Sequence, residues 1–187
     1  MRFERVTAAD SADLLSIYSY YVENTAISLE HKTPSEAEFS KRISDISSKY
    51  PYIKAVNDDG ITVGYAYATT FKPRASYDWS VETTIYVRRE FRSMGIGKLL
   101  YDKLEKSLIC MGILNMNACI VYPDSEDEYL TDDSVRFHTK YGFNVVGMFN
   151  KCAYKFGHWY NVVWMEKSIG IHCENIEAPS FGEWRIL

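Results

Sequence analysis

Hydrophobic residues recur along the chain at two spacings, and the first of them is helical. Apolar side chains follow a helical period after Asp10, which can serve as an N-cap, and again after Thr33-Pro34-Ser35-Glu36. The capping-box pattern of that tetrapeptide predicts that Pro34 is the first helical residue. A third helix is expected from Gly95 to about Met111, ended by Gly112, and a fourth over Ser134–Tyr141. The predicted apolar stripe of the third helix comprises Ile96, Leu99, Leu100, Leu104, Leu108 and Met111.

The second spacing is the alternation that is typical of strands. The segment Ile61–Phe71 alternates with the period of a half-buried strand, and Asn57-Asp58-Asp59-Gly60 favours an antiparallel hairpin with Pro51–Val56. The other predicted strands are Phe3–Thr7, Trp79–Val87, Leu114–Val121, Val145–Tyr154 and Trp159–Lys167. Consecutive hairpins interrupt the strand–helix alternation of a doubly wound chain. The order therefore predicts an α/β fold around one mixed sheet.

Length and composition limit the possible classes of protein. The chain has 187 residues, 47% of them hydrophobic, which suits one globular domain with a full core. Its formal net charge of −4 argues against binding to nucleic acid, because such domains present a basic stripe. No apolar run approaches the roughly 18 residues of a membrane-spanning helix, and MRFERVTAAD lacks the apolar stretch of a secretory signal. We expect a cytoplasmic protein.

Two smaller features complete this picture. The cysteines Cys110, Cys119, Cys152 and Cys173 show no paired spacing, so we expect reduced thiols and no metal site. Periodicity ends near Ser168. The sequence therefore predicts one domain over residues 1–168 and a C-terminal extension over 169–187, packed on the surface or on a partner.

The segment that carries chemistry runs from a strand through a basic turn into the third helix. Gly95 and Gly97 let the backbone approach a ligand closely. The first amides of a helix have no intrahelical partner and lie at the positive end of its dipole, an arrangement that binds phosphate or pyrophosphate. Arg92 and Lys98 would add positive charge. The spacing matches neither a Walker loop nor G-x-G-x-x-G.

The pattern R-x-x-G-x-G from Arg92 to Gly97 resembles the pyrophosphate loop of the GNAT superfamily of acetyl-CoA-dependent N-acetyltransferases. Further motifs resemble its phosphinothricin and methionine sulfone/sulfoximine N-acetyltransferases. These motifs are Lys72-Pro73-Arg74-Ala75-Ser76-Tyr77-Asp78-Trp79, Val81-Glu82-Thr83-Thr84-Ile85-Tyr86-Val87, Ser134-Val135-Arg136-Phe137-His138, Tyr141-Gly142-Phe143 and Lys155-Phe156-Gly157-His158-Trp159. The resemblance runs from about Arg5 to Trp164 and implies the GNAT fold, a mixed and mostly antiparallel sheet of about seven strands with about four helices.

The resemblance also implies a coenzyme site and a reaction. Acetyl-CoA would contact Ile85, Tyr86, Val87, Arg92, Ser93, Met94, Gly95, Ile96, Gly97, Lys98, Thr131 and Ser134, with the amide of Val87 on the thioester oxygen. This chain departs from the family in having Thr131 where Asn is frequent and in a longer acidic insertion from Asp124 to Leu130, within the acidic loop over 124–133. The implied acceptor is the α-amine of a small amino-acid-like substrate, and we expect direct attack in a ternary complex.

Glu82 and His138 are the candidate catalytic residues. An acid in mid-strand is unusual, and Glu82 can act as the general base, directly or through a water; the alternative is a structural ion pair with Arg74 or Lys72. His138 stands near the position from which many superfamily members protonate the coenzyme thiolate. A lone helical His can equally be a packing residue.

The substrate side is predicted from basic and aromatic residues. Lys72 and Arg74 suit an anionic group, and Glu82 lies beyond them. Tyr77, Trp79 and Trp159 could form the wall of the pocket, although Trp159 suits a dimer interface equally well. The chain is expected to be a homodimer. Acetylation of a polyamine, an aminoglycoside or a protein terminus, and a non-catalytic acyl-CoA-binding module, are the alternatives.

Overall fold

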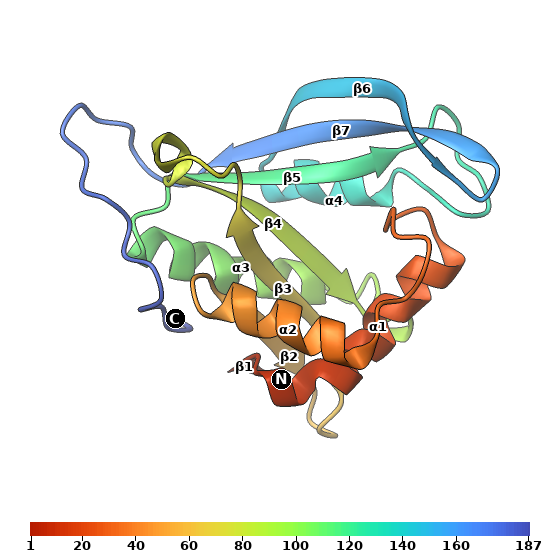
Figure 1. Cartoon of the computed structure of the whole chain (residues 1–187), viewed down its shortest axis with the longest axis horizontal. Coiled ribbons are helices and arrows are strands. Elements are labelled where there is room, and N and C mark those ends of the chain that lie inside the picture. The colour runs from red at the N-terminus through yellow and green to blue at the C-terminus, as the bar shows by residue number, and fades with distance from the viewer. The chain divides into compact units, whose positions relative to one another are not determined.

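The computed structural model describes every residue from Met1 to Leu187 (Figure 1). Its elements follow the predicted order of strand, two helices, three strands, helix, strand, helix and two strands. The strands are β1 (Arg2–Arg5), β2 (Tyr52–Val56), β3 (Thr62–Thr70), β4 (Ser80–Val87), β5 (Asn115–Tyr122), β6 (Asn144–Lys155) and β7 (His158–Ser168). The helices are α1 (Ser11–Asn24), α2 (Glu36–Ser47), α3 (Ile96–Cys110) and α4 (Asp133–Tyr141), with short 3₁₀ turns η1 (Ala8–Asp10), η2 (Ala75–Tyr77) and η3 (Arg89–Phe91).

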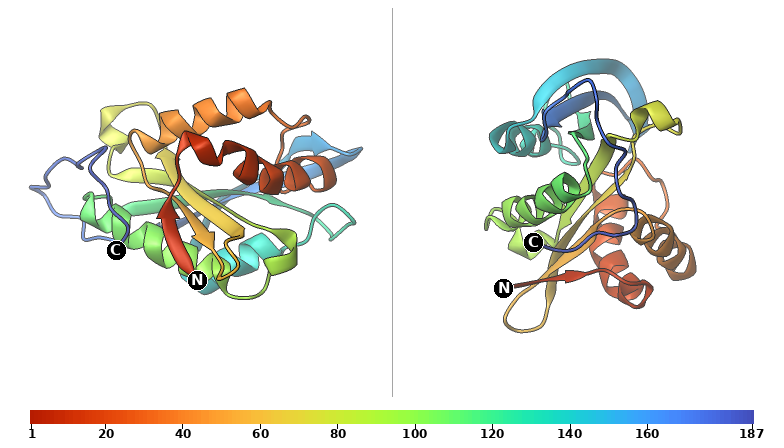
Figure 2. Two further views of the ribbon diagram at one scale, coloured as in Figure 1. Left: turned by 90° about the horizontal axis from the view of Figure 1, so that it is seen from below. Right: turned by 90° about the vertical axis from the view of Figure 1, so that its left-hand side faces the viewer.

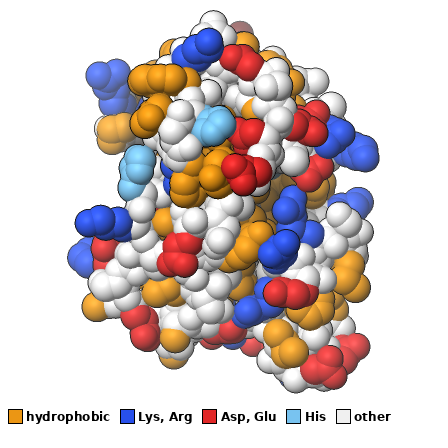
Figure 3. All heavy atoms as spheres, turned by 90° about the vertical axis from the view of Figure 1, so that its right-hand side faces the viewer, with side chains coloured by type: hydrophobic (Ala, Val, Ile, Leu, Met, Phe, Trp, Pro, Cys, Tyr) orange, Lys and Arg blue, Asp and Glu red, His pale blue; other side chains and the backbone are white.

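The seven strands form one mixed, mostly antiparallel sheet in the order β1-β2-β3-β4-β5-β7-β6, and four α-helices accompany it. The predicted fold class is therefore confirmed. None of the helices combines the length and the apolar character needed to cross a bilayer. On the face shown in Figure 3, basic and acidic side chains are interspersed among hydrophobic ones.

The chain divides into two compact units. The first contains residues 1–17, 34–116 and 168–187, and the second contains residues 18–33 and 117–167. The C-terminal tail thus belongs to the first unit, together with the strand that carries Glu82. The predicted domain boundary at residue 168 stays a prediction.

Strand β3 is more deeply buried than its alternation suggested. In the first unit β1, β2, β3 and β4 pair antiparallel in sequence order. Helices α2 and α3 cover opposite faces of these strands (Figure 2). All residues from Thr62 to Ala66 are consequently buried, so the expectation of a half-buried strand is wrong. A strand with a helix on each face places both sets of alternating side chains in a core.

Two helical predictions need correction. Helix α2 begins at Glu36, because the hydroxyl of Ser35 accepts a hydrogen bond from the Glu38 amide (3.2 Å) and so caps the helix. The predicted start at Pro34 is wrong by two residues, and Ser35-x-x-Glu38 is itself a capping pattern. On α3, Leu99 is 43% exposed and lies off the buried stripe, where Tyr101 is fully buried instead.

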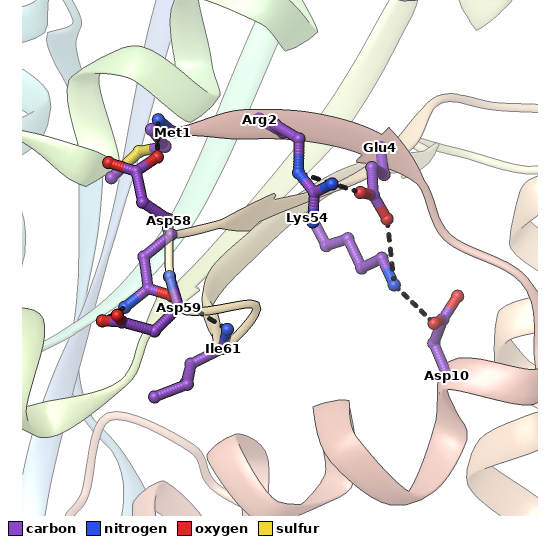
Figure 4. A network of polar contacts seen from close by, with 9 residues as sticks. Met1, Arg2, Glu4, Asp10, Lys54, Asp58, Asp59 and Ile61 are labelled. Carbon is purple, nitrogen blue, oxygen red and sulfur yellow. Dashed lines mark hydrogen bonds and ion pairs between the residues drawn. The ribbon is translucent and has the colours of Figure 1, made fainter.

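Ion pairs hold the edge strand β1 and the turn before α1 (Figure 4). Lys54 donates to Asp10 (2.6 Å) and pairs with Glu4 (3.5 Å), while the amide of Thr7 donates to Asp10 (2.8 Å). Asp10, the last residue of η1, therefore caps the start of this turn. Burial favours a higher pKa for Asp10, but the hydrogen bonds from Lys54 and Thr7 outweigh it and lower that pKa.

A buried lysine organises the second unit. Lys155, at the end of β6, is only 2% exposed, and its ammonium donates to the carbonyl oxygens of Val22 (2.7 Å), Thr25 (2.8 Å) and Ser28 (2.6 Å). These carbonyls lie at the end of α1 and in the loop after it. A cation at a helix C-terminus satisfies carbonyls that have no helical partner. Lys155 therefore fastens this loop to the β6–β7 hairpin.

The acidic loop over 124–133 is also ordered by specific contacts. The carboxylate of Asp127 accepts from the amides of Tyr129 and Leu130 (both 2.8 Å) and from the hydroxyl of Tyr160 on β7 (2.9 Å). Asp124 accepts from the side chain of Asn161 (2.7 Å). The loop is thus attached to β7 by its acidic residues.

Candidate active site

Glu82 occupies the middle of β4 and is half-buried. Burial raises the pKa of its carboxyl group above the ordinary value, and the positive charge of Lys72 offsets only part of this effect. A carboxylate whose pKa is raised by its surroundings is a stronger base than one in water. This is the property that a general base needs.

The backbone of β4 presents a regular edge of amides at its C-terminal end. The amide of Arg88 donates to the carbonyl of Val63 on β3 (2.8 Å), while Val87 lies opposite Gly64. Successive amides of an antiparallel strand point to opposite edges. The N–H groups of Ile85 and Val87 therefore point away from β3.

Gly64 on β3 lets the end of β4 approach closely. A Cβ atom at this position would lie 2.8 Å from the carbonyl oxygen of Tyr86 and 3.1 Å from Cα of Val87. A side chain here would therefore displace the segment predicted to contact the coenzyme. Gly64 was not among the predicted site residues, although a glycine inside a strand is a signal of close backbone approach.

The turn between β4 and α3 has the backbone of an anion site. Gly95 is the N-cap of α3 with φ of +80°, and Ser93 also has a positive φ of 62°. The amide of Leu99 makes the first intrahelical bond, to the carbonyl of Gly95 (3.2 Å), so the amides before it lie at the open positive end of the helix. A Cβ at Gly95 would meet nothing within 4 Å. The site is open, and its donors fit a diphosphate.

Charged side chains flank this turn. Arg92 is exposed immediately before it. Lys98 lies in the first turn of α3 and pairs with Asp102 (2.7 Å), so its charge is shared with a neighbouring carboxylate. Met94 is 66% exposed at the tip of the turn, and Ile96 is buried beneath it. Arg92 and Lys98 thus place two positive charges at this turn.

The connection from β3 to β4 carries the predicted substrate residues of the first unit. Lys72 and Arg74 are exposed, and the charge of Lys72 acts on Glu82. Tyr77 packs edge-on against Phe71, with ring centroids 5.9 Å apart. The indole N–H of Trp79 donates to the carbonyl of Glu177 in the C-terminal tail (2.9 Å).

His138 lies on α4 in the second unit and is buried between the rings of Phe137 and Phe143, each with a centroid 5.1 Å away. Its Nδ1 lies 2.7 Å from the carbonyl oxygen of Ser134, which can only accept, so Nδ1 carries the proton. Desolvation lowers the pKa of His138 to about 4. The imidazole is therefore neutral near pH 7, which favours the packing role.

The remaining predicted residues of the second unit are at its surface. The hydroxyl of Thr131 accepts a weak bond from the amide of Asp133 (3.4 Å), and Ser134 is partly exposed. Trp159 on β7 is 59% exposed and packs against Tyr154 on β6 at 5.1 Å. Its exposure beside another exposed aromatic ring favours an interface.

Comparison with known proteins gives the family. The family described as acetyltransferase (GNAT) domain matches residues 4–164. This chain belongs to the GNAT acetyltransferase family. The chain is 32% identical over 156 residues to the phosphinothricin N-acetyltransferase of Streptomyces viridochromogenes. The alignment covers 83% of this chain and 81% of that protein.

Two further relatives agree. This GNAT acetyltransferase is 26% identical to the L-methionine sulfoximine/L-methionine sulfone acetyltransferase of Pseudomonas paraeruginosa, over 86% of this chain and 90% of that protein. The crystal structure of a phosphinothricin acetyltransferase from Sinorhizobium meliloti, in complex with acetyl-CoA, superposes with a TM-score of 0.82 at 32% identity. That match covers 90% of this chain and 88% of the other. The predicted family and enzyme class are confirmed.

Proposed function

We propose that this GNAT acetyltransferase moves the acetyl group of acetyl-CoA to the α-amine of a small amino-acid-like substrate of the phosphinothricin, methionine sulfone or methionine sulfoximine type. The observation that carries the proposal is Glu82, a half-buried carboxyl group with a raised pKa beside the charge of Lys72. The named activities of the relatives support the same acceptor class.

In the proposed reaction Glu82 takes a proton from the ammonium group of the bound substrate. The neutral amine nitrogen attacks the thioester carbonyl carbon, and the C–S bond breaks. The nitrogen gives up one proton as it becomes an amide, and the departing thiolate takes up one proton to become the free thiol of the coenzyme. Val87 lies five residues after Glu82, about 16 Å along an extended strand. If the amide of Val87 binds the thioester oxygen, this spacing favours proton transfer from the amine to Glu82 through water rather than by direct contact.

The coenzyme would bind with its diphosphate at the start of α3. The open amides beyond Gly95 and the exposed charge of Arg92 support this placement, and the exposed segment 93–95 leaves room for a ligand. Lys72 and Arg74 would bind the anionic group of the acceptor, for which the guanidinium of Arg74 offers two parallel hydrogen bonds. His138 is not assigned the return of the proton to the thiolate, because its surroundings keep it neutral.

The experiment is a thiol-release assay with acetyl-CoA and a panel of amines. Methionine sulfone, methionine sulfoximine and phosphinothricin are the expected acceptors, and a polyamine, an aminoglycoside and a peptide with a free N-terminus represent the alternatives. The proposal fails if one of these alternatives is acetylated with a much higher kcat/KM. Binding of acetyl-CoA without release of thiol for any amine would indicate a binding module.

We also propose a homodimer that uses the edge strand β6. Its apolar side chains Val145, Val146, Met148 and Phe149 are about half or more exposed, and an exposed apolar edge strand is a typical site for self-association. Light scattering should give twice the mass of the chain, and Phe149→Asp should give a monomer. A wild-type protein that is monomeric at assay concentrations would contradict this. The expected cytoplasmic location stays a prediction.

A further inference from the structure

The C-terminal tail is a continuous strap on the first unit, although it lies beyond the family match, which ends at residue 164. It has no helix or strand, and in the right-hand view of Figure 2 it runs in dark blue past α3. Backbone amides fasten it along its length: Ile169 donates to Leu114 (2.8 Å), Ser180 to Met111 (2.9 Å) and Gly182 to Lys49 (3.1 Å).

Side chains fix the far end of the strap. Trp184 is 6% exposed, and the guanidinium of Arg5 lies 4.2 Å above its ring. The ring of Phe181 lies 5.6 Å from that of Tyr50. The buried hydroxyl of Ser107 on α3 lies within hydrogen-bond distance of two carbonyl oxygens, those of Arg185 (2.8 Å) and of Lys103 (2.9 Å). Together these contacts hold residues 177–187 in one path.

On this path the strap contacts Trp79. The carbonyl of Glu177 accepts from the indole N–H of Trp79 at 2.9 Å. The backbone carbonyl of Trp79 accepts from the amides of Leu114 (2.8 Å) and Asn115 (3.1 Å) at the start of β5. Trp79 is therefore held both through its backbone and through its side chain.

Trp79 is also the last residue of the connection that carries Lys72 and Arg74. Most of this connection is exposed, and its backbone bonds are local: the amide of Arg74 donates to Lys72, and that of Tyr77 to Arg74 (both 2.9 Å). Local turns leave the orientation of an exposed loop to the residues at its two ends. Holding one end firmly reduces the number of loop conformations, and hence the entropy lost when the loop binds a ligand.

We propose that the C-terminal tail, through the Glu177–Trp79 hydrogen bond, fixes the Lys72–Asp78 loop and so sets the affinity for the amine substrate, without contacting the amine. Trp79 is then a positioning residue rather than part of the pocket wall. Alternation along β4 agrees with this role, because Trp79 shares the face of the buried residues Val81 and Thr83, opposite to Glu82. The proposal rests on the proposed function for its kinetic readout.

The test compares two Trp→Phe variants. Trp79→Phe removes the indole N–H that donates to Glu177 in the tail. Trp184→Phe, the control, removes a longer indole hydrogen bond from the tail to the carbonyl of Ser47 (3.5 Å). Trp79→Phe should raise KM for the best amine about fivefold, the effect of one lost hydrogen bond, with KM for acetyl-CoA unchanged. Trp184→Phe should leave both KM values within about twofold of wild type.

A truncation separates positioning from direct contact. Deletion of residues 175–187 should raise the amine KM at least as much as Trp79→Phe, and adding Trp79→Phe to the truncated chain should have no further effect. If the amine KM of the double variant instead rises by the product of the two separate effects, Trp79 acts independently of the tail and the proposal is overturned. Equal rises of both KM values would indicate a general loss of structure and would also overturn it.

Hydrogen exchange tests the same link without turnover. Amides of residues 72–78 should exchange faster in Trp79→Phe and in the truncated chain than in wild type or Trp184→Phe. Unchanged exchange in Trp79→Phe would refute the claim that the tail fixes the loop through Trp79. This readout does not require the truncated chain to fold. If the wild type acetylates no amine of the panel, the proposed function fails, while exchange still decides whether the tail fixes the loop.

Discussion

Replacing Glu82 by Gln changes one carboxyl group into an amide of nearly the same shape, and so removes the proposed base with little change in packing. Loss of a general base typically costs roughly 100- to 10 000-fold in turnover, which corresponds to about 3 to 5 kcal/mol in the activation free energy. We therefore expect kcat to fall within this range for the best acceptor. The affinity for acetyl-CoA should stay within about twofold, because the proposed diphosphate site lies at the start of α3.

The structure also gives the sign of two accompanying effects. Burial raises the pKa of Glu82 in the folded protein, so a charged Glu82 costs folding free energy at neutral pH, and Glu82→Gln should melt at the same or a higher temperature. A Glu82 that served only as a structural ion pair would give a lower melting temperature. The wild-type kcat should fall as the pH drops through the raised pKa. In Lys72→Met this fall should occur at a higher pH, since the lysine lowers that pKa.

The assay is a stopped or continuous thiol-release measurement over a range of pH, with circular-dichroism melting of each variant. Glu166→Gln is the matched control, because Glu166 is an exposed glutamate on β7 and the same charge is removed. The control should have wild-type turnover. Near-normal kcat in Glu82→Gln at saturating substrates, or a marked drop in its melting temperature, would refute the assignment of Glu82 as the base.

Three further changes test other parts of the account. Gly64→Ala should push the end of β4 outward by the contact with Tyr86 and raise the dissociation constant of acetyl-CoA several-fold; calorimetry would show an unchanged value if the close approach does not matter. His138→Phe should lower stability but leave the pH profile of kcat unchanged, because the imidazole is already neutral. If the variant instead lost the fall in kcat at high pH, His138 would be the acid that protonates the thiolate. Lys155→Met should cost about 3 to 5 kcal/mol in denaturant unfolding, because three buried carbonyls lose their donor, and a loss below about 1 kcal/mol would show that water replaces it.

The order of elements followed directly from the sequence because periodicity and turn residues are local signals. Gly60 and Gly112 stand at the predicted turn and the predicted helix end, and both adopt the left-handed conformation. The errors have tertiary causes. Burial of both faces of β3 depends on α2 and α3, which no alternation within β3 reports. The start of α2 was misplaced because two overlapping capping patterns compete, and the hydroxyl that reaches an amide decides between them.

The backbone of the turn was predictable because one continuous segment forms it. Residues 92–98 start α3 at Gly95 through local backbone geometry, as the motif predicted, while their binding of the coenzyme stays a prediction. The environment of His138 was not predictable, since its pKa depends on the rings and carbonyl around it. Lys155 was visible only as part of a motif, because its three partner carbonyls are more than a hundred residues away. Long-range backbone contacts of this kind leave no pattern in the sequence.

The most direct test of the central claim is calorimetric titration of the protein with acetyl-CoA, using two glycine variants. Gly95 and Gly60 have nearly the same positive φ, +80° and +81°, and a Cβ at either would meet nothing within 4 Å. Substitution by Ala therefore imposes similar backbone strain at both sites. Binding should be 1:1 in the wild type and in Gly60→Ala. It should be at least about tenfold weaker in Gly95→Ala, which perturbs the amides proposed to bind the diphosphate. Absence of any heat of binding in the wild type, or equal affinities of the two variants, would contradict the account.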